Sequence, residues 1–121
     1  MTVFSASSIA LFLAASFSSL NPEQQREIDC LAVLTVAATE KDSEAKFGIP
    51  ALSERTDRLS RAVGARYTTE YGLTVDDFTS IFTERLIDAM MRNTGGANRV
   101  ELIRPEAMAC AERLPPVAPA G

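Results

Sequence analysis

The stretch NPEQQREIDCLAVLTVAA, residues 21–38, decides the fold. Asn21 is a favoured helix N-cap, Pro22 suits the first helical position, and Gln24 can return a hydrogen bond to the cap. From Ile28 to Ala38 the residues are apolar on most sides, which is typical of an enclosed helix. We therefore expect a central helix that the rest of the chain surrounds.

A second helix is predicted from about Ala51 to Tyr71. The polar stretch 39–46 ends the first helix, and Gly48-Ile49-Pro50 breaks the chain because the residue before a proline is pushed out of the α region. Gly72 supplies the left-handed residue that closes the helix. Gly64 lies inside it, and we expect a close helix crossing to compensate for that glycine. The apolar residues recur at helical spacing: Leu52, Leu59, Val63 and Tyr67.

Two further helices complete the predicted fold. Thr74, with Asp77 three residues on, forms a capping box of the carboxylate kind and opens a third helix, which ends in the glycine-containing stretch 93–98. Pro105 is predicted to be the first residue of a short fourth helix that runs through Leu114. No segment shows the sustained alternation of a strand. The sequence therefore predicts an all-α protein, a small four-helix bundle with an additional N-terminal apolar leader.

The chain divides into a leader, a domain and a tail. Residues 1–20 carry no charged side chain and match the length of a signal peptide; an uncleaved membrane anchor and an N-terminal helix packed within the fold are the alternatives. Residues 21–114 form the helical domain. Residues 115–121 contain three prolines and are expected to be extended and mobile. We expect a periplasmic or secreted protein, with membrane contact only if the leader is retained.

The chain has two cysteines, Cys30 in the first helix and Cys110 in the fourth. In an exported protein such a pair favours a structural disulfide; two buried free thiols and a reactive or intermolecular cysteine are the alternatives. The chain contains no Cys-x-x-Cys. A bridge would close a loop of about 80 residues and hold the first helix to the last.

Composition disfavours several classes of function. The chain has no histidine and a net charge of −4, all of it after Leu20. An acidic domain repels phosphate backbones, so nucleic-acid binding is disfavoured. Glu84 and Asp88 lie one helical turn apart, but Arg85 and Arg92 are close enough to neutralise them, so a metal site or acid–base catalysis is not expected there. We predict no enzyme activity, no metal and no cofactor.

Three sets of side chains are candidates for a binding surface. Tyr67 and Tyr71 could line a groove, although tyrosines more often close the edge of a core with their hydroxyls in water. A basic stripe on the second helix could meet an acidic partner, although interleaved carboxylates favour a solvated face: Arg55, Arg58, Arg61 and Arg66. The methionines could form an adaptable surface, although they also fill gaps in helical cores: Met90, Met91 and Met108.

Four short motifs together resemble a group of small exported helical proteins of alphaproteobacteria. They are Asp29-Cys30-Leu31-Ala32, Val63-Gly64-Ala65-Arg66, Tyr71-Gly72-Leu73-Thr74 and Met108-Ala109-Cys110. The resemblance spans about Pro22 to Leu114. It implies an envelope setting, a four-helix shape and a paired cysteine, and it implies no particular activity.

These observations lead to two functional hypotheses. The first is a non-enzymatic binding or interaction module with an unidentified protein partner in the cell envelope, such as an accessory subunit of an envelope complex. The alternative is a periplasmic stress chaperone that acid activates, because protonated carboxylates lose their ion pairs with the arginines and the bundle loosens.

Overall fold

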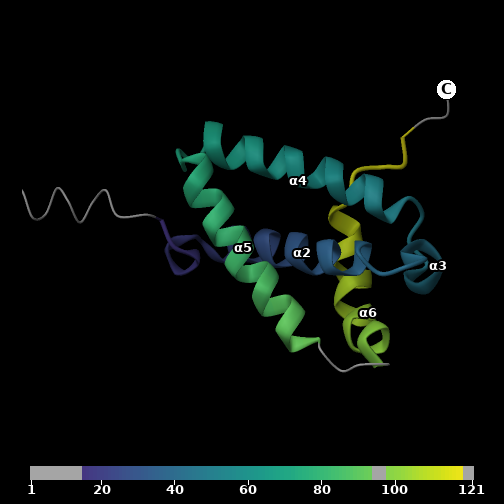
Figure 1. Ribbon diagram of the computed structural model, residues 1–121. Helices are drawn as coiled ribbons and strands as arrows, with labels where there is room; N and C mark the ends of the chain where they lie inside the picture. Colours follow the sequence, from purple (N-terminus) through teal and green to yellow (C-terminus); the bar gives the residue numbers. More distant parts are fainter. Residues whose placement is uncertain (1–14, 94–97, 119–121) are drawn as a thin grey trace, which may run out of the picture.

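The computed structural model describes residues 15–93 and 98–118, and this part of the chain is all-helical without strands (Figure 1). Most of the predicted leader, residues 1–14, lies outside the described residues. No helix within the described ranges is long and apolar enough to span a membrane. The α-helices are α2 (Pro22–Ala38), α3 (Ser43–Phe47), α4 (Leu52–Thr69), α5 (Val75–Arg92) and α6 (Arg99–Cys110), with short 3-10 turns η1 (Phe17–Ser19) and η3 (Ala111–Arg113).

Helix α2 is the centre of the molecule, as predicted. It contacts α4, α5 and α6 (Figure 1). Its N-terminal capping box is complete: the Gln24 N–H donates to Asn21 Oδ1 at 2.8 Å, and the Asn21 N–H donates to Gln24 Oε1 at 3.0 Å. The side chains of Leu31 and Leu34 are wholly buried. Apolar residues on nearly every side of α2 therefore determine that the other long helices must cover it.

Two clusters of buried side chains lie along α2. One joins the C-terminal half of α2 to α3, α6, the start of α4 and the second half of α5, and includes Phe47, Leu52 and Ala89. The other joins its N-terminal half to the end of α4 and the start of α5, and includes Ile28 and Tyr67. Leu59 packs against both clusters. The core is therefore continuous from one end of α2 to the other.

The short helix α3 was not predicted. Within the described residues there are five α-helices rather than four, because the polar stretch after α2 contains a single helical turn. Phe47 and Ile49 are buried on either side of Gly48, which closes α3 with φ +67°. Two apolar side chains in a polar segment are too few to show a helical period, so only their burial against the core reveals this turn.

Helices α4 and α5 meet at a tight corner. Gly72 adopts the left-handed φ of +72°, and the Asp77 N–H donates to Thr74 Oγ1 at 3.0 Å, which confirms the predicted boundary. A Cβ atom at Gly64 would lie 3.5 Å from the Phe78 ring, an ordinary van der Waals distance. Phe78 of α5 therefore packs over Gly64, as a helix crossing there requires, but the contact leaves room for a Cβ atom.

Helix α6 runs through Pro105, so the prediction that Pro105 starts a helix is wrong. The proline removes one backbone hydrogen bond inside the helix. Residues on both sides of it pack against the same core cluster, at the helical spacing 100, 103, 107 and 110: Val100, Ile103, Ala107 and Cys110. Burial of this continuous stripe holds the two halves of α6 in line.

The proline-rich tail begins in contact with the domain. Leu114 is buried, and Pro115 and Pro116 follow it in extended conformation. Their carbonyl oxygens accept hydrogen bonds from two arginines of α4: Arg55 Nε donates to Pro115 at 2.7 Å, and Arg58 donates to Pro116. The first residues of the tail are thus held against α4.

Candidate binding groove

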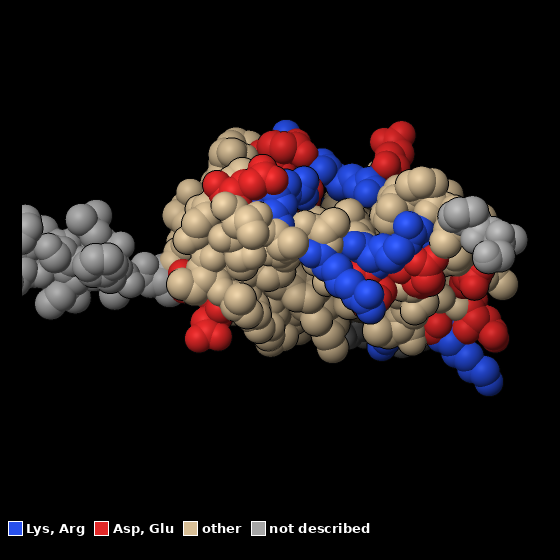
Figure 2. All heavy atoms as spheres, turned by 90° about the horizontal axis from the view of Figure 1, so that it is seen from above, with Lys and Arg blue, Asp and Glu red and all other residues tan. Residues whose placement is uncertain are grey.

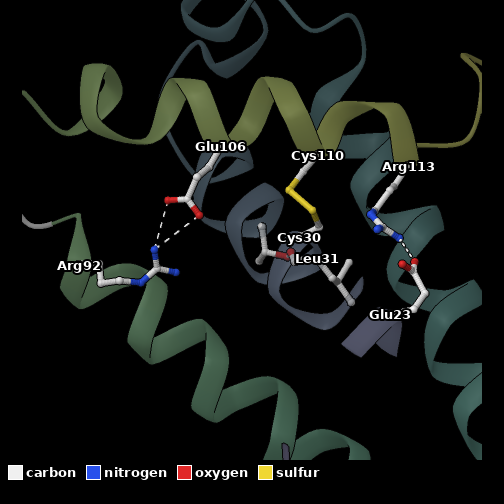
Figure 3. The surroundings of a disulfide bond; sticks show 8 residues. Glu23, Cys30, Leu31, Arg92, Glu106, Cys110 and Arg113 are labelled. Atoms are coloured by element: carbon white, nitrogen blue, oxygen red, sulfur yellow. Dashed lines mark hydrogen bonds and ion pairs between the residues drawn. A yellow bond between two sulfur atoms is a disulfide. The ribbon is translucent and has the colours of Figure 1, made fainter. Parts of the chain in front are cut away.

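The cysteine pair joins α2 to α6. Cys30 and Cys110 form a disulfide, with their Cα atoms 5.3 Å apart across 80 residues of sequence (Figure 3). Ion pairs flank the bridge on both sides: Arg92 with Glu106, and Arg113 with Glu23. Since both sulfurs are bonded to each other, the bridge offers no thiolate nucleophile, and we assign it a structural role.

The four predicted partner-facing arginines make contacts within the chain. Arg55 and Arg58 hold the tail, Arg61 pairs with Asp57, and Arg66 pairs with Glu27 of α2. Figure 2 shows basic and acidic side chains interleaved on the face seen from the top of Figure 1. The structure does not bring these arginines together as a patch of one sign, so we do not place the candidate site on them.

Asp88, one of the two carboxylates considered as a metal or acid–base site, is also engaged within the chain. Asp88 accepts hydrogen bonds from Arg85 and Arg92, at 3.3 and 2.9 Å, as predicted for a neutralised carboxylate beside Glu84. No group of three acidic, cysteine or histidine side chains suited to a metal ion occurs in the described ranges.

Tyr67 belongs to the core rather than to a groove. Its ring is fully buried and meets the Tyr71 ring edge to face at 4.9 Å. Its hydroxyl donates to Glu27 Oε1 at 2.9 Å and lies 3.2 Å from the Gln24 carbonyl oxygen. Burial, and then the hydrogen bond to the Glu27 carboxylate, raise the pKa of the Tyr67 hydroxyl well above its usual value. The expectation of a hydroxyl in water therefore fails for Tyr67, which ties α4 to α2.

A groove lies between α4 and α5, and a separate hollow of about 350 Å³ lies beside the disulfide. The two helices diverge from their shared corner, and α2 lies between them (Figure 1). Two adjoining hollows of about 350 and 250 Å³ share Thr35 and Thr39 of α2. We call their union the α4–α5 groove. It is lined by Thr35, Val36, Ala38, Thr39, Ser53, Thr56, Asp57, Ser60, Phe82, Leu86, Met90 and Arg99.

The two walls of the groove differ in chemistry. The α5 wall is apolar, formed by Phe82, Leu86 and Met90, and the Met90 side chain is 51% exposed. Ile87, next to this wall, is also exposed. The α4 wall consists of small polar residues at helical spacing: Ser53, Thr56, Asp57 and Ser60. The floor on α2 is made of threonine, alanine and valine. Short side chains on floor and wall let another backbone approach closely.

One buried polar atom lines this groove without a partner. Thr56 is 4% exposed, and its Oγ1 makes no hydrogen bond within the described part of the chain. The hydroxyls of Thr35 and Thr39, in contrast, donate to the α2 carbonyls of Leu31 and Val36, both at 2.7 Å. Buried hydroxyls are rarely left unpaired, so this one requires an explanation.

Sequence reasoning named one residue of the α5 wall as a surface candidate, with gap-filling in the core as the alternative, and missed the α4 wall. Met90 was proposed as part of an adaptable surface, and it lines the groove; Met108 lies exposed on α6 and does not. The small polar stripe of α4 was overlooked because serine and threonine on a charged helix look like ordinary surface. Comparisons with protein-family models, with curated proteins and with solved structures returned no match.

Proposed function

We propose that this protein is a non-enzymatic interaction module of the cell envelope whose α4–α5 groove receives an α-helical segment of a partner protein. The observation that carries the proposal is the splay of α4 and α5, which leaves Thr35 and Thr39, at the C-terminal end of α2, partly open beside the exposed Met90. An amphipathic helix that lays its apolar side into an apolar groove is a recurrent mode of peptide recognition. Methionine suits such a site because its flexible side chain adapts to different apolar surfaces.

Two features support the envelope setting. The uncharged, apolar N-terminal sequence has the character of an export signal, and the disulfide between Cys30 and Cys110 is the kind of bond that persists in an oxidising compartment. Intact-mass measurement of protein from its own cells, with and without reductant, tests both: we expect loss of the leader mass and a bridge that resists alkylation.

Peptide titration tests the groove directly. The chain contains no tryptophan, so a model amphipathic helical peptide with one tryptophan on its leucine face reports its own burial by fluorescence. We expect saturable binding with a blue shift. The change Met90→Glu should weaken binding at least about tenfold, because it places a charge on the apolar wall.

Met108→Glu is the matched control, since Met108 is 46% exposed on α6 and does not line the groove. Its affinity for the peptide should equal that of the wild type. The absence of saturable binding, or equal weakening by both changes, would contradict the proposal.

One observation favours the chaperone as a second candidate. Carboxylates on α2 or directly after it form ion pairs with arginines from each of the surrounding elements except α3. The pairs are Glu23 with Arg113 of η3, Glu27 with Arg66 of α4, Asp29 with Arg85 of α5, and Glu40 with Arg99 of α6. Acid would protonate these carboxylates together and weaken every one of these links to the central helix, exposing the apolar surface of α2.

Acidification with an environment-sensitive dye and an aggregating client protein tests this candidate. We expect dye binding and client protection to begin together as the pH falls. The double change Glu23→Gln/Glu40→Gln should move that onset to higher pH. Glu84→Gln is the control, because Glu84 makes no ion pair between helices in the described ranges. Protection at neutral pH, or none at low pH, would exclude acid activation.

A further inference from the structure

The two walls of the α4–α5 groove differ in chemistry. This difference indicates the kind of ligand more closely than the apolar character of the α5 wall alone. We infer that the segment bound there is an amphipathic helix with a basic flank: its apolar side contacts the α5 wall, and its lysine, arginine or amide side chains donate hydrogen bonds to the α4 wall. This inference rests on the proposed function.

The first support is the unpartnered Thr56 hydroxyl. Thr56 lines the part of the groove between α2 and α4, and its Oγ1 is buried beneath that surface without a partner among the described residues. A buried hydroxyl without a partner destabilises the free protein, whereas a donor from a bound side chain would satisfy it. The position of Thr56 therefore favours a ligand that brings a polar group to this wall and disfavours a wholly apolar one.

The second support is the charge of the α4 wall. Asp57 is the single charged side chain among the described residues that line this part of the groove. It pairs with Arg61 at 2.7 Å, but both side chains are more than half exposed. Such a pair is weak and leaves Asp57 able to attract a second cation. A negative charge on a chain of net charge −4 favours a basic flank over an acidic one.

The small residues of this wall favour a helix as the form of the ligand. Ser53, Thr56 and Ser60 recur one turn apart, so no long side chain of α4 stands between the groove floor and an incoming backbone. At the other end of the groove lies Arg99, whose Nη1 pairs with Glu40 Oε2 at 3.1 Å. Its cation suits the negative C-terminal end of a bound helix, which gives the helix a direction.

Paired peptides and two protein variants test the inference. The peptides share a leucine face with one tryptophan and differ only in a lysine or a glutamate flank. At low salt we expect the lysine peptide to bind at least about fivefold more tightly, with a preference that falls as salt rises. Asp57→Asn should reduce the affinity for the lysine peptide by about two- to fivefold. Glu70→Gln removes the same charge at the far, exposed end of α4 and should leave the affinity unchanged.

Thr56→Val separates a binding role from a structural one. Valine keeps the shape and removes the unpaired hydroxyl, so the free protein should melt at a higher temperature while binding the lysine peptide several-fold more weakly. A purely structural Thr56 would change stability and leave the affinity unchanged, which would contradict the inference.

The outcomes separate failure of the basic-flank inference from failure of the proposed helix-binding function. Equal affinity for the two peptides would show that the flank is not basic while leaving a helix-binding groove in place. Failure of both peptides would overturn the groove itself. Sedimentation of the free protein at the same concentrations completes the test: a dimer that Met90→Glu dissociates would show that a second copy fills the groove, and the inferred partner would be wrong.

Discussion

The two sides of α2 are built differently. On one side α6 lies against α2 along a continuous buried stripe and is fixed to it by the disulfide, and Arg113 of the following turn η3 pairs with Glu23 of α2. On the other side α4 and α5 both pack along α2, but they touch each other near their shared corner and then separate from one another, leaving the groove. Part of α2 thus stays open between α4 and α5, while the disulfide fixes another side of the same helix to α6.

Removal of the disulfide should have the largest effect on this arrangement. Replacing both cysteines, Cys30→Ser/Cys110→Ser, reopens a loop of 80 residues and should lower the free energy of unfolding by about 4–5 kcal/mol in the chain-entropy model. Chemical denaturation with and without reductant measures it. The wild type in reductant should match the double variant. A loss of unfolding free energy below about 1 kcal/mol would show that the packing of α6 on α2 does not depend on the disulfide.

Shortening a side chain in the core around α2 should cost more unfolding free energy than shortening one on the open groove wall. Leu31 is wholly buried, so Leu31→Ala should cost about 2–5 kcal/mol through lost burial and a residual cavity. Met90→Ala, on the open wall, should cost less than about 1 kcal/mol. Thermal and chemical denaturation of the two variants compares them, and equal losses would mean that the groove is closed in solution.

The Tyr67 hydroxyl should make stability fall in alkali. Because burial raises its pKa, the folded state keeps the phenol proton where the unfolded chain, with a pKa near 10, loses it. The stabilisation is therefore present below about pH 10 and is lost as pH rises above it. Tyr67→Phe should cost about 1–2 kcal/mol at neutral pH and flatten this dependence. Denaturation midpoints from pH 8 to 12 test both, and an equally steep fall in the phenylalanine variant would assign the effect elsewhere.

The smallest effect is expected from Glu23 at low pH. Hydrogen bonds from Arg113 and Arg26 lower the pKa of this carboxylate. A lowered pKa stabilises the fold when the pH is above the unfolded value of 4.5, and this stabilisation is lost as the pH falls below that value. Glu23→Gln should therefore reduce the acid dependence of the denaturation midpoint slightly, because the group is fully exposed. A midpoint unchanged by acid in the wild type would also count against the chaperone.

The sequence predicted the helices whose signals are local. The Asn21 and Thr74 caps and the left-handed Gly72 were each readable from a few neighbouring residues, and the structure confirms them. Pro105 misled because a local rule for helix starts was overruled by burial of residues on both sides of it. Met90 could be named as a surface candidate, whereas the role of Thr56 could not, since an unpaired hydroxyl exists only relative to its neighbours in space.

By itself the sequence determined the all-helical class, the central place of α2 and the residues that begin and end most helices, because these depend on side-chain period and on backbone preferences within a few residues. The tertiary structure alone decided that α4 and α5 separate and that the arginines of α4 bind the tail and nearby carboxylates. It also decided that small polar residues of α4 line one hollow with Phe82 of α5. Those features depend on the angles at which helices cross, and crossing angles are set by packing between residues distant in the chain.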